Sequence, residues 1–186
     1  MTNTKRITTK ELVLGAVFTA VLIVLSQLSI PLPSGVPITL QTFAVALCGY
    51  VLGWKLGLCS VGVYVLLGLA GVPVFSNFSG GAGVLFGMTG GFIFGFLAMA
   101  ALCGVSVRFQ NPAICIALGL AGLLTCHLAG AVQFSLVTQN TVLQSFLIAS
   151  VPYLIKDVLS VAGAYLVALA VRKGLAAAHL TGYASN

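Results

Sequence analysis

Charged side chains are scarce in this sequence. Only 5% of its 186 residues are charged, and the acidic ones number two, Glu11 and Asp157. A soluble domain carries about 25% charged residues, so this chain cannot cover its surface in water. With 60% hydrophobic residues and a mean hydropathy of +1.16, the composition indicates an integral membrane protein.

Several catalytic and metal-binding patterns are also missing. There is no G-x-x-x-x-G-K-[ST] motif, and no lysine follows a glycine, which excludes ATP hydrolysis at a P-loop in this chain. The five cysteines include no C-x-x-C pair, so they indicate neither a metal site nor a disulfide framework. Paired-carboxylate catalysis would need Glu11 and Asp157 in one place, which their positions do not favour. We therefore expect no enzyme, no metal and no cofactor.

Long uncharged stretches predict the membrane crossings. A bilayer core needs roughly 20 apolar residues for each helical crossing, and the apolar stretches hold six such lengths. Prolines and glycines in Ser29–Pro37 and Gly71–Gly83 interrupt them. An extra short helix within Thr138–Ser150 is left open. We expect an all-α bundle of six transmembrane helices in a single domain over 1–186, with helices at about 10–28, 38–53, 56–70, 83–106, 112–137 and 143–171.

The basic residues predict the orientation of this bundle. With six crossings, seven of the eight fall on one side, which the positive-inside rule assigns to the cytoplasm. We expect both termini there, and Gly71–Gly83 outside. The net charge of +6 then reflects topology and attraction to the membrane surface, not nucleic-acid binding. The seven are Lys5, Arg6, Lys10, Lys55, Arg108, Arg172 and Lys173.

Asp157 is the candidate functional residue within the membrane. A carboxylate at the centre of a transmembrane helix costs about 2.5–3.5 kcal/mol on insertion scales and marks a functional site by default. We interpret it as facing a polar cavity, near backbone carbonyls freed by Pro152. The alternative is a structural ion pair with Lys156. His127 is interpreted as a histidine packed and hydrogen-bonded between helices, with a contact to a ligand as the alternative.

The interruption between Gly71 and Gly91 has the composition of a small-molecule site. Ser76–Gly81 supplies hydroxyls, an amide and exposed backbone, and Phe75 and Phe78 supply flat apolar surfaces. Apolar walls with a few directed hydrogen bonds are typical of ligand pockets. The alternative is a plain surface connector, although long connections in compact domains are more often functional.

Three segments of the chain resemble a known family. PLPSGVPITLQTFAVALCGYVLG, LLGLAGVPVF and GGAGVLFGMTGGFIFGF are similar to segments of the BioY family, the biotin-specific S components of energy-coupling factor (ECF) vitamin transporters. The resemblance covers nearly the whole chain. It implies a multi-pass S component of a prokaryotic cell membrane that binds biotin from outside with high affinity. It also implies a transmembrane coupling subunit and two ATPases as partners.

The resemblance also implies a set of binding residues. Asp157 would accept hydrogen bonds from the ureido N–H groups of biotin, and Asn77 or Ser79 would meet the ureido carbonyl. Ser160 stands where the family has a lysine, so Lys156 is the candidate cation for the valerate carboxylate. Three aromatic candidates would cover the apolar body of biotin, namely Tyr64, Phe75 and Phe92. The remaining candidates are Gln41, Gly80 and Gly81. Phe92 replaces the family tyrosine and offers no hydroxyl.

Small residues predict two kinds of close contact. Glycines four apart at 49, 53 and 57 and at 87, 91 and 95 are expected to bring helices together. On the first helix, Ala16 and Ala20 match the A-x-x-x-A face at which, by resemblance, S components dock the coupling subunit. Other functions stay open: an S component for another small vitamin, a structural or assembly membrane protein, or a stand-alone channel or carrier.

Overall fold

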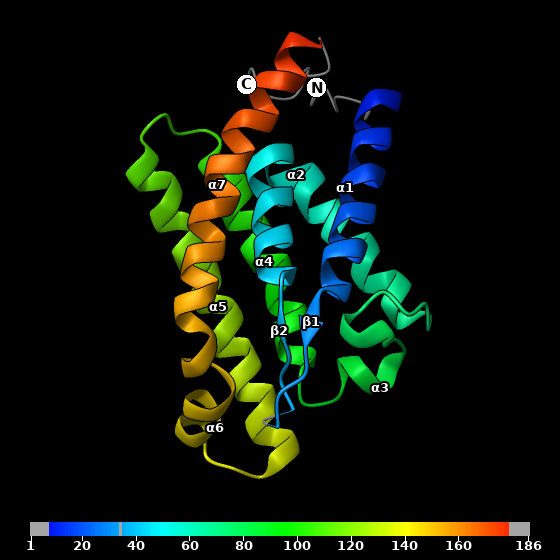
Figure 1. Cartoon of the computed structure of the whole chain (residues 1–186), viewed down its shortest axis with the longest axis vertical. Coiled ribbons are helices and arrows are strands. Elements are labelled where there is room, and N and C mark those ends of the chain that lie inside the picture. The colour runs from blue at the N-terminus through cyan, green and yellow to red at the C-terminus, as the bar shows by residue number, and fades with distance from the viewer. Residues whose placement is uncertain (1–7, 34, 179–186) are drawn as a thin grey trace, which may run out of the picture.

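The computed structural model describes residues 8–33 and 35–178. Lys5 and Arg6, two of the basic residues that are predicted to lie on the cytoplasmic side, are outside the described residues. Within this part the chain forms α-helices and one short antiparallel β-hairpin (Figure 1). Two 3₁₀ turns, η1 and η2, connect some of the helices. The elements are α1 (Thr9–Gln27), β1 (Ser29–Ile30), β2 (Ile38–Thr39), α2 (Gln41–Leu69), η1 (Ser76–Phe78), α3 (Ala82–Leu85), α4 (Gly90–Ser106), α5 (Pro112–Thr138), α6 (Val142–Ala149), η2 (Val151–Tyr153) and α7 (Leu154–Ala177).

Helix α1 begins with a capping box. The Thr8 side chain accepts a hydrogen bond from the Glu11 backbone N–H at 3.3 Å, and the Glu11 carboxylate accepts one from the Thr8 N–H at 2.7 Å. These bonds satisfy two backbone donors that a helix start leaves free. The Glu11 carboxylate, one of two side-chain carboxylates in the sequence, therefore has a structural role at the N-terminal end of α1.

Helix α2 is a helical hairpin that reverses direction at Gly53. That residue has φ 75° and ψ 174°, a backbone region that is essentially restricted to glycine. The Gln41 side-chain amide donates a hydrogen bond to the Tyr64 hydroxyl at 2.6 Å, whereas a straight helix would place these residues about 35 Å apart. The two arms of α2 therefore lie side by side, and the predicted turn between helices 38–53 and 56–70 is this reversal.

Glycines let the helices approach to backbone contact. A Cβ added at Gly91 would lie 2.3 Å from the Ala129 carbonyl oxygen, and one at Gly95 would lie 2.6 Å from the Cys126 Cα. Gly49 makes the corresponding contact between α2 and the Ala100 carbonyl of α4, at 2.5 Å. The predicted packing role of these spaced glycines is confirmed at these three positions.

Two predicted helices are interrupted in the structure. The helix expected at 83–106 divides into α3 and α4, and the Gln133 side-chain amide of α5 donates to the carbonyls of Leu85 and Gly87 at 2.7 and 2.8 Å. The helix expected at 143–171 divides into α6, η2 and α7, because Pro152 has no backbone N–H to continue a helix. The short helix left open within Thr138–Ser150 is α6.

The remaining boundaries differ only slightly from the expectations. Helix α2 begins at Gln41 and not at position 38, because Ile38 and Thr39 pair with the strand β1. Among the residues that the structure describes, four helical segments are long and apolar enough to cross a membrane, namely α1, α2, α5 and the α6–α7 segment Val142–Ala177. Helix α4 is a shorter apolar helix.

The helix ends, the connections between helices and the short elements lie at two opposite ends of the bundle (Figure 1). The start of α1, the reversal of α2, the α4–α5 connection and the last turns of α7 lie at one end. The β-hairpin, α3 and α6 lie at the other. With the exception of Lys156, the basic residues that the structure describes belong by sequence to the elements at the first end: Lys10, Lys55, Arg108, Arg172 and Lys173.

Candidate ligand-binding site

A partly open cavity, with about 620 Å³ of empty space between its walls and in its open mouth, lies toward the end of the bundle that holds the β-hairpin. Residues from β2, the loop that follows α2, η2 and helices α2 to α7 line it. Its apolar wall contains aromatic side chains, Phe75, Phe92 and Phe96 among them. Polar groups converge on it from several elements, including Gln41, Thr42, Ser76, His127, Lys156 and Asp157.

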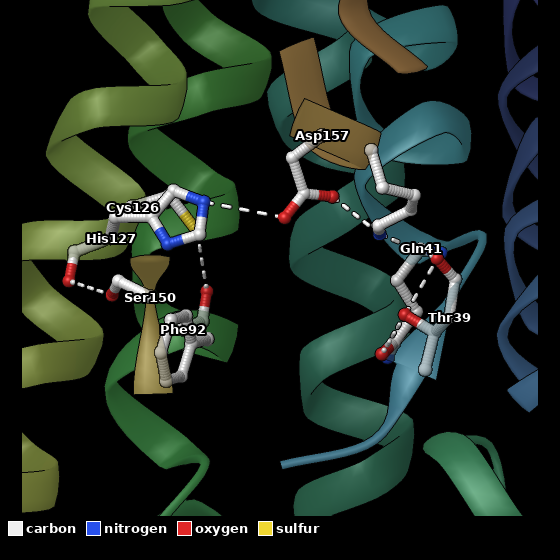
Figure 2. Close-up of polar contacts among 8 residues, drawn as sticks. Thr39, Gln41, Phe92, Cys126, His127, Ser150 and Asp157 are labelled. Atoms are coloured by element: carbon white, nitrogen blue, oxygen red, sulfur yellow. Dashed lines mark hydrogen bonds and ion pairs between the residues drawn. The ribbon is translucent and has the colours of Figure 1, made fainter. Parts of the chain in front are cut away.

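Asp157 lies at the centre of the polar groups. It is buried in the first turn of α7, and its Oδ2 atom lies 3.3 Å from Nε2 of His127 on α5, as Figure 2 shows. The ammonium group of Lys156 contacts the other carboxylate oxygen. A buried carboxylate is tolerated where opposite charges and hydrogen bonds compensate it, and these two side chains supply that compensation.

Lys156 connects this centre to the β-hairpin. Its Nζ donates a hydrogen bond to the backbone carbonyl of Thr39 on β2 at 2.8 Å. The side chain keeps 30% of its surface exposed, while that of Asp157 keeps 6%. Lys156 therefore stands at the accessible edge of the cavity, between the hairpin and α7, and Asp157 stands deeper.

His127 also borders the cavity. Its ring meets that of Phe92 edge to face, with centroids 5.8 Å apart. The Nδ1 atom is buried and has no hydrogen-bond partner in the part of the chain that the structure describes. The expected position between two helices is confirmed, since His127 on α5 faces Asp157 on α7, but the expected hydrogen bonding is not met at Nδ1 by the described residues. The same residue also lines the cavity.

Hydrogen bonds with two neighbouring residues fix the position of the Gln41 side chain. Its amide donates to the hydroxyl of Tyr64, and its carbonyl oxygen accepts a hydrogen bond from the Thr39 hydroxyl at 3.1 Å. Tyr64 is fully buried, does not line the cavity, and packs edge to face on Phe75 with centroids 5.3 Å apart. Tyr64 thus positions two cavity residues from outside the cavity.

The polar loop after α2 uses its polar groups in hydrogen bonds within the loop and to the neighbouring elements β1 and α2. The Asn77 side-chain oxygen Oδ1 accepts a hydrogen bond from the Ser29 hydroxyl at 2.6 Å, and the Ser79 hydroxyl donates to the Ser76 backbone carbonyl at 2.7 Å. The Gly81 N–H donates to the Gly68 carbonyl at 2.6 Å. A Cβ at Gly80 would lie 2.4 Å from the Val72 carbonyl oxygen. These contacts hold the loop in shape.

The structure brings together only part of the predicted binding set. Gln41, Phe75, Phe92, Lys156 and Asp157 line the cavity. The other predicted residues do not line it, because they lie behind its wall or in the body of the loop: Tyr64, Asn77, Ser79, Gly80 and Gly81.

Sequence reasoning did not include five polar lining residues in the site. They are Thr39, Thr42, Thr89, His127 and Tyr153. The Tyr153 hydroxyl donates to the Val36 carbonyl at 2.6 Å. A histidine within an apolar run was the available signal for His127, because ionisable residues in membrane helices tend to mark functional sites. Thr42 and Tyr153 stand in segments whose composition gives no comparable signal.

A bundle of apolar helices with a partly polar cavity near one end is the architecture of a membrane protein that holds a small molecule. The chain belongs to the BioY family, whose profile matches residues 1–177. It is 39% identical over 165 residues to the biotin transporter BioY of Thermotoga maritima, covering 88% of this chain and 96% of that protein. It is 35% identical to a probable biotin transporter BioY of Pyrococcus horikoshii, covering 86% of this chain and 94% of the relative.

A solved structure has the same fold. It is the crystal structure of the S-component for biotin from an ECF-type ABC transporter, with a TM-score of 0.78 and 30% sequence identity, and the match covers 93% of both chains.

Proposed function

We propose that this chain is the biotin-binding S component of an ECF-type importer in a prokaryotic cell membrane. The observation that carries the proposal is the buried carboxylate of Asp157, held between His127 and Lys156 at a cavity with aromatic walls. The family membership and the named relatives support it. In this function the chain binds and delivers its ligand and performs no catalysis.

The cavity chemistry matches the groups that biotin presents. The ureido ring offers two N–H donors, and the Asp157 carboxylate accepts hydrogen bonds from them within the cavity. The carboxylate of the valerate chain meets Lys156, whose position at the accessible edge suits the charged end of the ligand. Phe75 and Phe92 cover the apolar thiophane ring. Asn77, Ser79, Gly80 and Gly81 contribute by fixing the loop that presents Phe75 and Ser76.

The proposed topology has six crossings and cytoplasmic termini. Helix α2 contributes two crossings because it reverses at Gly53, and α1, α4, α5 and α7 contribute one each. The positive-inside rule then assigns the end with Lys10, Lys55 and Arg108 to the cytoplasm. The cavity opens toward the opposite, external side, from which a nutrient would arrive.

Ala16 and Ala20 are the proposed docking residues for the coupling subunit. Both are exposed on α1, on the side of the helix that does not contact the rest of the chain. Small side chains let two membrane helices approach closely. The coupling subunit would link this chain to two ATPases, which supply the ATP hydrolysis for which this sequence has no P-loop.

Ligand identity is tested by purification of the full chain in detergent, followed by denaturation and mass spectrometry of the released small molecules. We expect biotin at one molecule per chain, and competition by biotin but not by other vitamins in a binding assay. Release and binding of another vitamin would replace biotin as the ligand. A chain that binds no vitamin would favour the structural or assembly function.

A further inference from the structure

A second hollow lies at the other end of the molecule. It holds about 1440 Å³ of open space between the α4–α5 connection and the last turns of α7. Arg108 comes from the connection, and Arg172 and Lys173 come from α7. Three cations from two separate elements therefore line one hollow, which we call the basic cavity.

The charges of the basic cavity are not balanced within the part of the chain that the structure describes. Both side-chain carboxylates of the sequence are engaged elsewhere, Glu11 in the cap of α1 and Asp157 in the ligand cavity. Arg172 is half-buried, whereas Arg108 and Lys173 are exposed. A half-buried guanidinium with five N–H donors calls for an anion.

The other walls of the basic cavity are apolar or aromatic. Phe109 and Leu169 are 44% and 40% exposed beside the cations. Tyr50 and Tyr165 meet edge to face with centroids 5.4 Å apart, and the Tyr50 hydroxyl donates to the Cys115 carbonyl at 3.1 Å. The surface therefore offers cations for an anionic head and apolar side chains for a hydrocarbon tail.

We propose that the basic cavity binds the phosphate headgroup of an anionic phospholipid. Guanidinium groups recognise phosphate through paired N–H···O bonds, and basic pockets between transmembrane helices on the cytoplasmic side suit anionic lipid headgroups. The exposed apolar residues on a membrane helix favour a lipid over a soluble phosphate. One headgroup held by Arg108 and Arg172 would join the α4–α5 connection to α7. This site is separate from the ligand cavity; it rests on the proposed orientation of the bundle but not on the proposed transport function.

Native mass spectrometry of the full chain in detergent, titrated with phosphatidylglycerol or phosphatidylcholine, tests the proposal. We expect the wild type to retain one phosphatidylglycerol in preference to phosphatidylcholine. The variant Arg108→Gln/Arg172→Gln should bind phosphatidylglycerol about ten- to thirty-fold more weakly. The matched control Lys10→Gln/Lys55→Gln removes two charges from the same end, outside the basic cavity, and should bind as the wild type does. Biotin affinity should be unchanged in both.

Other results would overturn the proposal. Equal retention of the two lipids would contradict the proposal. A phosphatidylglycerol preference that survives in the arginine double variant would also contradict it, and an acidic partner protein would then become the candidate occupant of the basic cavity. Displacement of the lipid by millimolar inorganic phosphate would assign the site to a soluble anion. If the double variant fails to fold, Arg108→Gln and Arg172→Gln tested singly must each weaken phosphatidylglycerol binding several-fold.

Discussion

Lys156 donates a hydrogen bond to the Thr39 carbonyl across the edge of the ligand cavity, at 2.8 Å. The same ammonium group contacts Asp157. A ligand carboxylate that approaches this edge would meet a cation already oriented by a backbone acceptor on one side and a carboxylate on the other.

The variant Lys156→Gln separates two uses of this cation. If Lys156 holds the valerate carboxylate, we expect biotin to bind about ten- to a hundred-fold more weakly, because a hydrogen bond to a charged group contributes about 1.5–3 kcal/mol. An uncharged biotin amide should then bind almost as it does to the wild type. Titration calorimetry with both ligands measures this. Equal losses for both would show that Lys156 acts through Asp157, and Lys55→Gln is the control for loss of a lysine elsewhere.

Asp157→Asn keeps the size of the side chain and one acceptor but removes the charge. We expect biotin affinity to fall about ten- to a hundred-fold, because the bonds from the ureido N–H groups lose their charged acceptor. The amount of folded protein should be unchanged. Glu11→Gln removes the only other acidic side chain, which lies outside the ligand cavity, and should keep wild-type affinity. Unchanged binding in Asp157→Asn would make the aspartate structural.

Gly53→Ala tests the reversal of α2. At φ 75° and ψ 174° an alanine is strained, and we expect the free energy of unfolding to fall by about 1–3 kcal/mol. Gly62→Ala is the matched control on the same helix, because an added Cβ there has nothing within 4 Å and helical alanine is favoured over glycine. Denaturant titration in detergent compares the two. Equal stability of both variants would be inconsistent with the described turn.

Ala16→Trp combined with Ala20→Trp tests the docking face. We expect biotin uptake by cells to be lost while the purified chain still binds biotin, because bulky side chains keep a partner helix away. Leu128→Trp, at a half-exposed position on α5, controls for the addition of a large residue to the bundle surface. Normal uptake by the alanine double variant would place the coupling subunit elsewhere.

Cysteines placed at opposite ends test the orientation. In a cysteine-free background, Ser79→Cys should react with an impermeant thiol reagent added to intact cells, and Arg108→Cys should react only after the membrane is opened. Ser34 is a further predicted external position that lies outside the described residues. Labelling of Arg108→Cys in intact cells would reverse the proposed topology.

The sequence predicted features that local chemistry determines. Prolines between positions 29 and 37 stop the first helix, and Asp157 stands out as a carboxylate in an apolar run. Contacts between distant segments could not be predicted in this way. Asn77 was assigned to the ligand as a polar loop residue, but its side-chain oxygen bonds to Ser29, 48 positions away. His127 was not assigned to the ligand site, because its contact with Asp157 depends on how α5 and α7 pack.

The reversal at Gly53 has a consequence for how the protein enters its membrane. The Gln41 amide and the Tyr64 hydroxyl satisfy each other only when the two arms of α2 lie together. An arm inserted by itself would carry these polar groups into lipid without partners, at a cost of several kcal/mol. The two arms are therefore expected to leave the ribosome and partition into the bilayer as one preformed helical pair.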